Sequence, residues 1–160
     1  MESTRAIGYS LEAAIADVVD NSIAANAHNI HINFFPVDDE YVFILDDGCG
    51  MDSIEITNAM QYGSKNPNEA RNINDLGRFG LGLKTASLSQ CRSLTVVSKK
   101  SGIIVCRQWD LDYVQEMETW ALKELGEDEI QDLPGLEDLK CQDSGTLVVW
   151  QKLHTTPLCR

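Results

Sequence analysis

A glycine-rich run at the point where a helix should begin constrains this chain more than any other feature of its sequence. The run extends from Gly77 to Lys84, and residues 83–90 have the small and apolar pattern of a helix. Glycines let the backbone turn with positive φ and approach a ligand closely. Backbone N–H groups at a helix start, with the charge of Lys84 beside them, attract an anion. The run therefore predicts a phosphate-binding loop, with an ordinary loop as the alternative, and two polar clusters upstream favour the first interpretation.

The composition predicts one domain and excludes several classes of function. The 160 residues suffice for a single domain with a real core, and no signal peptide or apolar stretch long enough to span a membrane is present. We expect a cytoplasmic protein. A net charge of −12 argues against a nucleic-acid surface on this domain. The five cysteines form no C-x-x-C pair, which predicts free thiols rather than a zinc site.

Apolar periodicity predicts an alternation of helices and strands. Ser10 is the expected cap of the first helix, and Asp52 or Ser53 of the second. The first strand should be half-buried and the second central. Residues 61 to about 76 form a long polar loop before the glycine run, which is typical of a lid, and residues 113–143 have no clear pattern. The predicted helices cover 9–27, 53–60 and 83–90, and the predicted strands cover 29–35, 41–45, 93–98, 103–109 and 145–150.

Two polar clusters precede the glycine run. Asp17 and Asn21 lie four residues apart and share one face of the first helix. A carboxylate suits a general base that accepts a proton from water, and an amide oxygen suits Mg²⁺ beside phosphates. A solvated helix face is the alternative interpretation of this pair.

The second cluster ends the predicted central strand with Asp46, Asp47, Gly48, Cys49 and Gly50. A carboxylate at this position can accept a hydrogen bond from the exocyclic amine of adenine, and the glycines leave room beneath a flat ring. An ordinary turn and a calcium loop are the alternatives. The calcium loop is disfavoured because the regular acidic spacing and the closing glutamate are missing.

The order of these motifs resembles that of the GHKL ATPases, the superfamily of gyrases, ninety-kilodalton chaperones, histidine kinases and MutL proteins. The segment from Ala16 to Ser22 looks like the N box of the microrchidia and chaperone-like branch, and the Gly77–Lys84 run looks especially like the microrchidia form. Ser144-Gly145-Thr146 matches the late Gly-Thr element. The run is neither a Walker loop nor a Rossmann fingerprint.

The resemblance implies the Bergerat fold, an α+β two-layer sandwich with helices on one face of a mixed, largely antiparallel sheet. It implies ATP and Mg²⁺ as cofactors, with Asp17 as the catalytic base, Asn21 as the metal ligand and Asp46 as the residue that binds the adenine amine. The other implied nucleotide contacts are Gly48, Gly50, Met51 and Thr146 at the base and Gly77, Arg78, Phe79, Gly80, Leu81, Gly82, Leu83 and Lys84 at the phosphates.

Two departures from the family pattern weaken the expectation of rapid turnover. The family's usual base is glutamate, whereas Asp17 is one methylene shorter, and a misplacement of about 1 Å can cost on the order of a hundredfold in rate. Ala24 also stands where many relatives place an aspartate. A degenerate nucleotide sensor is therefore one alternative to a slow ATPase switch, and a histidine-kinase-type phosphotransfer domain is another.

The resemblance also bears on the rest of the protein. Relatives draw a further cation from a following transducer domain and dimerise on binding ATP, and such a cation contributes strongly to phosphoryl transfer. We expect residues 1–160 to be a single ATP-binding domain, the N-terminal part of a larger protein, with weak activity alone.

Overall fold

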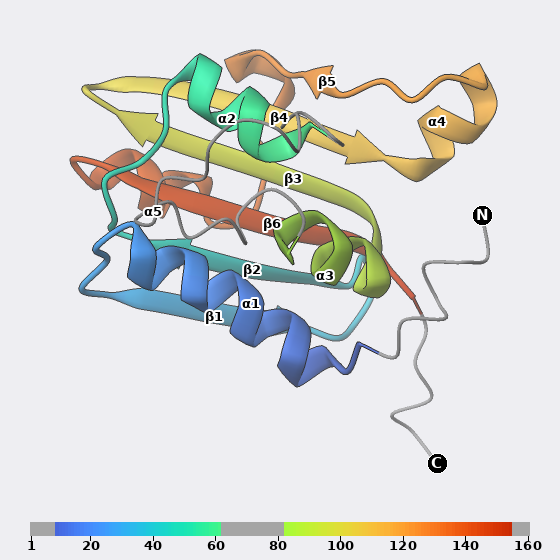
Figure 1. The fold of residues 1–160 in the computed structure, drawn as a ribbon, viewed down its shortest axis with the longest axis horizontal. Helices are drawn as coiled ribbons and strands as arrows, with labels where there is room; N and C mark the ends of the chain where they lie inside the picture. Colours follow the sequence, from blue (N-terminus) through green and yellow to red (C-terminus); the bar gives the residue numbers. More distant parts are fainter. Residues whose placement is uncertain (1–8, 62–81, 155–160) are drawn as a thin grey trace, which may run out of the picture.

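The computed structural model describes residues 9–61 and 82–154. The expected helices and strands are present in the expected order, and short elements occupy the region that had no clear pattern (Figure 1). The elements are α1 (Leu11–Ala24), β1 (Ile30–Phe35), β2 (Tyr41–Asp46), α2 (Ser53–Met60), α3 (Gly82–Gln90), β3 (Cys91–Lys100), β4 (Ile103–Asp110), α4 (Leu111–Met117), β5 (Lys123–Glu124), the 3-10 helix η2 (Glu127–Glu129), α5 (Leu136–Cys141) and β6 (Gly145–Leu153).

The strands form one six-stranded sheet in the order β1-β2-β6-β3-β4-β5. Each neighbouring pair among the described strands is antiparallel, so the expected α+β fold is confirmed without a parallel pair. The last strand, β6, lies between β2 and β3, and its register places Thr146 directly opposite Asp46. Two residues far apart in the sequence thus meet at one end of the sheet.

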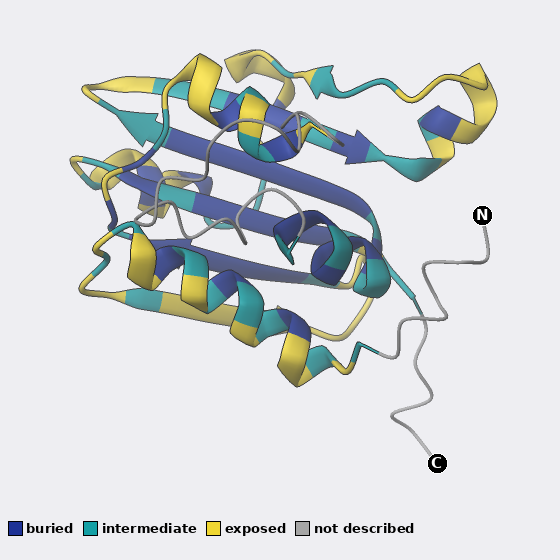
Figure 2. Cartoon of the chain, in the orientation of Figure 1, coloured by how far each residue is buried: buried dark blue, intermediate teal, exposed yellow. Residues whose placement is uncertain are grey.

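Hydrophobic clusters cover both faces of the sheet. On one face, α1, α2 and α3 pack on alternate strand residues that include Val42, Ile44 and Trp150. On the other face, Phe43 and Leu45 of the same strand pack with α5. The central strands are accordingly buried in Figure 2. The main helical layer lies on one face as expected, and the short α5 adds cover to the other.

Local capping sets the helix boundaries. The Ser10 hydroxyl accepts a hydrogen bond from the Ala13 N–H, as expected. Of the two expected caps of α2, Asp52 is the one in the structure, and Glu55 completes a capping box that was not predicted from the sequence. The first helix ends at Ala24 and not at residue 27, so the predicted end was wrong. The chain turns there because Asn26 adopts a left-handed conformation with φ of 59°. The early end of α1 leaves its last turn beside the end of β2.

The first strand is more exposed than the alternating pattern predicts. It lies at the edge of the sheet, where it pairs with β2 alone among the described strands. Ile32 and Phe34 are each 48% exposed, so the prediction of a half-buried strand was wrong. The apolar alternation cannot distinguish a central strand from an edge strand, because both have the same period of two.

The four described cysteines are free thiols, as the sequence predicts. Cys91 and Cys106 are free and buried, and burial raises the pKa of the Cys106 thiol to about 12. Cys49 and Cys141 are free and exposed. In residues 9–61 and 82–154, no helix has the length and apolar character needed to cross a membrane.

Candidate nucleotide-binding site

A cavity of about 200 Å³ lies between the last turns of α1, the chain that follows β2, the start of α3 and the start of β6. It brings together six residues that the sequence singled out, namely Asn21, Asp46, Gly50, Met51, Leu83 and Thr146. Ala24 and Cys49, which were named from the sequence without a binding role, line it as well. The remaining lining residues were not assigned to the site from the sequence, and they are Val18, Ser22, Ala25, Ala59 and Val148. The wall is mostly apolar with a few polar groups, which is typical of a small-molecule site.

Asp46 is the most constrained polar residue of this cavity. It is 5% exposed, and its Oδ1 atom accepts hydrogen bonds from the N–H groups of Gly48 at 2.9 Å and Thr146 at 3.2 Å. Its Oδ2 atom accepts one hydrogen bond, from the Ser22 hydroxyl at 2.8 Å. Burial raises the pKa of the Asp46 carboxyl above its usual value, and these hydrogen bonds oppose the rise.

The hydrogen bonds of Asp46 leave one of its two oxygens open to a ligand. A carboxylate oxygen has two lone-pair sites, and the two backbone donors occupy both sites of Oδ1. Oδ2 has one donor and therefore keeps one site. Because Asp46 lines the cavity, the carboxylate can accept one further hydrogen bond from a donor placed there. An amine of a flat heterocycle meets this requirement.

Ser22 is the polar residue that sequence reasoning overlooked. It is 2% exposed, and its hydroxyl contacts the one Asp46 oxygen that retains a free lone-pair site. The signal was present in the sequence, since Ser22 lies four residues after the core residue Val18 and therefore on the buried face of α1. A hydroxyl on a buried helix face needs a partner, and Ser22 has two candidate acceptors, the Val18 carbonyl of its own helix at 3.4 Å and Asp46 of the sheet at 2.8 Å.

Thr146 is oriented by a neighbouring strand. Its Oγ1 atom lies 2.8 Å from Oγ of Ser98, which also accepts the Met51 N–H at 2.8 Å and donates to the Gly145 carbonyl at 3.0 Å. Because Ser98 has one hydroxyl proton and gives it to Gly145, Thr146 must be the donor to Ser98. The Thr146 hydroxyl therefore presents acceptor lone pairs to the cavity.

The two glycines after β2 are required by protein packing. A Cβ at Gly50, where φ is 68°, would lie 2.1 Å from the Lys99 carbonyl oxygen. A Cβ at Gly48 would lie 2.8 Å from the Ala25 Cβ. Gly50 lines the cavity and Gly48 does not. The expected room beneath a ring is therefore not the main reason for these glycines, since each Cβ would collide with the protein itself.

Asn21 and Asp17 share a helix face, but only Asn21 lines the cavity. The Asp17 carboxylate accepts a hydrogen bond from the Tyr9 hydroxyl at 3.0 Å, just before α1. The hydrogen bond to Asp17 is the largest cause that raises the pKa of Tyr9, and burial acts in the same direction. The roles of both α1 residues as metal ligand and base stay predictions.

The glycine run lies mostly outside the described residues. Gly77, Arg78, Phe79, Gly80 and Leu81 fall there, as does the predicted lid apart from Gln61. Of the rest, Gly82 begins α3 and Leu83 lines the cavity. Lys84 is 1% exposed and donates to the Gln61 carbonyl, and burial lowers the pKa of its amine. The phosphate contact expected of Lys84 stays a prediction.

A comparison of the sequence with protein families agrees with the interpretation of this cavity as a nucleotide-binding site. Residues 9–146 match the family of histidine kinase-, DNA gyrase B- and HSP90-like ATPases. The match covers most of the chain, which therefore belongs to this ATPase family. The resemblance to the GHKL superfamily is thus confirmed.

Several curated proteins similar to this chain are microrchidia proteins. ATPase morc-1 of Caenorhabditis elegans is 38% identical over 93 residues, which are 58% of this chain and 10% of that protein. Human ATPase MORC2 is 30% identical over 100 residues, or 60% of this chain and 10% of that protein. Human MORC family CW-type zinc finger protein 1 is 27% identical over 112 residues, which are 66% of this chain and 11% of that protein. The chain thus spans about a tenth of the length of these relatives.

Proposed function

We propose that this chain is a Mg²⁺-dependent ATP-binding domain that hydrolyses ATP slowly and acts as a conformational switch. The observation that carries the proposal is the juxtaposition of Asp46 and Thr146 in one cavity, with the free lone-pair site of Asp46 Oδ2 available to it. Membership of the ATPase family and the two relatives named as ATPases support it.

The base of the nucleotide binds at the Asp46 end of the cavity. The exocyclic amine of adenine donates to Asp46 Oδ2, the oxygen that also accepts from Ser22. The lone pairs of Thr146 accept from a water that completes recognition. Guanine carries a carbonyl oxygen at the position of that amine, so it would place an acceptor against the carboxylate. A site built for a hydrogen-bond donor rejects such an analogue strongly.

The phosphates extend from the base toward α1 and α3. The Asn21 side chain, which lines the cavity, supplies a carboxamide oxygen of the hard type that Mg²⁺ accepts. Asn21 would hold the metal together with phosphate oxygens and waters, the ligands that Mg²⁺ usually keeps. Bound Mg²⁺ offsets the negative charge of the phosphates. Gly77 to Lys84 wrap the phosphates, and Asp17 accepts a proton from the attacking water.

A nucleotide sensor without catalysis is the second candidate. It is favoured by the hydrogen bond that the Asp17 carboxylate accepts from Tyr9, together with the absence of Asp17 from the residues that line the cavity. Both candidates bind ATP, and they differ only in turnover. Under either one, the larger protein is a cytoplasmic switch that dimerises when ATP binds, with no nucleic-acid surface on this domain.

Nucleotide binding tests the proposal directly. Isothermal calorimetry with Mg²⁺ should detect ATP binding and a much weaker affinity for GTP. Replacing Mg²⁺ by EDTA should weaken the binding of ATP. Equal affinity for the two nucleotides would contradict the assignment of Asp46 to the adenine amine, and an absence of any nucleotide binding would overturn the proposed function.

A further inference from the structure

The chain that follows β2 leaves the sheet at Asp46 and loses its strand partner there. We define the β2 loop as residues 46–51, and the last residue of β2 that pairs with β6 is Asp46. Backbone groups beyond that point need other partners. Side chains of the turn between α5 and β6, namely Gln142 and Ser144, supply two of them.

These two contacts come from one short turn and reach alternate residues of the β2 loop. The Gln142 Nε2 atom donates to the Asp46 carbonyl at 3.0 Å, and the Ser144 hydroxyl donates to the Gly48 carbonyl at 2.7 Å. The turn itself is held by Lys99, whose Nζ donates to the Gln142 carbonyl at 2.6 Å. The β2 loop is therefore attached to the end of α5 as well as to the sheet.

Gly48 links the Ser144 contact to the carboxylate of Asp46. Its carbonyl accepts from Ser144, and its N–H donates to Asp46 Oδ1 at 2.9 Å. On the other side Gly48 lies against Ala25, where even a Cβ atom would come within 2.8 Å. Gly48 is therefore held by Ser144 and Asp46 through hydrogen bonds and by Ala25 through packing. These contacts fix the position of the N–H group that orients the Asp46 carboxylate.

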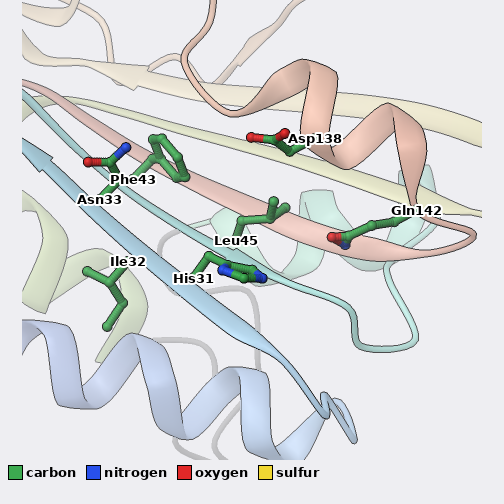
Figure 3. A pocket seen from close by; sticks show the side chains of 7 residues that line it. All are labelled: His31, Ile32, Asn33, Phe43, Leu45, Asp138 and Gln142. Carbon is green, nitrogen blue, oxygen red and sulfur yellow. The ribbon is translucent and has the colours of Figure 1, made fainter.

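We propose that Gln142 and Ser144 are positioning residues for adenine recognition, which they serve by fixing the β2 loop from outside the cavity. The inference rests on the proposed function. Neither residue lines the nucleotide cavity. Gln142 instead lines a separate cavity of about 390 Å³ on the α5 face of the sheet, with Asp138 of α5 and His31 of β1 (Figure 3). Their effect on the nucleotide therefore passes through the Asp46 carbonyl and Gly48.

The effect can be measured as a change in nucleotide discrimination. Ser144→Ala should weaken ATP binding by about two- to tenfold, the range expected for one lost hydrogen bond. It should also lower the ratio of ATP to GTP affinity, because the carboxylate would lose its fixed orientation. Gln142→Glu keeps the size of the side chain but replaces the donor by an acceptor, and it should act in the same direction. Calorimetry with Mg²⁺ on the intact chain gives both quantities.

Two control variants separate positioning from general destabilisation. Ser144→Thr keeps the hydroxyl and should keep the parental discrimination. Gln131→Ala removes an exposed glutamine that makes no contact with the β2 loop among the described hydrogen bonds. If Ser144→Ala and Gln142→Glu lower the unfolding temperature but keep parental affinity and discrimination, the inference is overturned and the proposed function stands. If Ser144→Ala fails to fold, Gln142→Glu decides by the same criterion. If the parent binds no adenine nucleotide, the proposed function is wrong, and the inference, which rests on it, is wrong as well.

Discussion

The two ends of the nucleotide cavity differ in how completely the described residues build them. At the base end, the Asp46 carboxylate is fixed by Ser22, Gly48 and Thr146. At the phosphate end, Asn21 lines the cavity without a comparable set of partners, and Asp17 is hydrogen-bonded to Tyr9. The first end is organised before any ligand binds, whereas residues 77–81, which are predicted to contact the phosphates at the second, lie outside the described part of the chain.

This difference indicates that binding and hydrolysis depend on separate parts of the domain. Groups that are already hydrogen-bonded in place lose little entropy when the ligand arrives, so the base end should supply the selectivity. Catalysis requires a base placed accurately relative to water and phosphate. Changes at the base end should therefore alter affinity, and changes at α1 should alter turnover or the metal dependence.

The largest effect is expected at the base end, from Asp46→Asn. The amide would direct a donor at Ser22, Gly48 or Thr146, each of which donates to Asp46 in the structure. It would also disturb the acceptor that adenine needs. We expect ATP affinity to fall by about a hundredfold or more. Calorimetry on this variant and on Asp132→Asn, an exposed control, measures the effect. Parental affinity in Asp46→Asn would remove the distinction between the two ends.

The next largest effect is expected on turnover, from Asp17→Ala. General acid–base groups contribute on the order of a hundredfold or more to a rate. The slow hydrolysis of ATP should therefore be lost while ATP affinity stays within about twofold, and Asp17→Glu should keep or raise the rate. Phosphate release is the measurement, with Asp20→Ala on the adjacent, exposed helix face as the control. Hydrolysis at the parental rate by Asp17→Ala would favour the sensor.

A smaller effect is expected from Asn21→Ala, which removes the amide oxygen assigned to the metal. The affinity for ATP in the presence of Mg²⁺ should fall about tenfold, since one of several oxygen ligands is lost. In EDTA, the variant and the parent should bind ATP equally, because no metal is present to contact the amide. The same loss in EDTA as in Mg²⁺ would show that Asn21 supports the cavity wall and does not hold the metal.

The smallest effect is expected from Asp47, the neighbour of Asp46, and it concerns the stability of the folded state at acid pH. Asp47 accepts hydrogen bonds from His28 and Asn29, which lower its pKa from 3.8 to about 2. The stability that this carboxylate contributes is present above pH 3.8 and is lost as the pH falls toward 2. Asp47→Asn should therefore flatten the decline of the unfolding temperature across that interval. An unchanged decline would indicate that these hydrogen bonds do not favour the ionised form in the folded state.

The pH response of Asp46 should have the opposite sign. Burial raises its pKa, so the folded state holds the proton more tightly than the unfolded state does. Between its ordinary pKa of 3.8 and the raised value, stability falls as the pH rises. The contributions of these two adjacent aspartates to stability therefore change in opposite directions with pH, because Asp46 is buried beneath α1 and Asp47 is not.

Much of the fold could be predicted because its signals are local. The apolar pattern from Tyr41 to Leu45 indicated a central strand, and β2 lies between two others. Ser10 and Asp52 marked helix starts that the structure confirms. The exposure of β1 could not be predicted, because it depends on which strands become neighbours in the sheet. The short elements after Tyr113 could not be predicted either, because they depend on where the remaining apolar residues are buried.

The sequence by itself determined the chemistry available to this protein, because the order of Asp17, Asn21, Asp46, the glycine run and Thr146 is enough to identify the family. The tertiary structure decided which of these groups meet. Insertion of β6 between β2 and β3 places Thr146 beside Asp46, 100 residues away, and packing of α1 on the sheet brings Ser22 to the same carboxylate. Such contacts depend on the order of strands in the sheet and on how helices pack against it. Neither can be predicted from the spacing of residues along the chain.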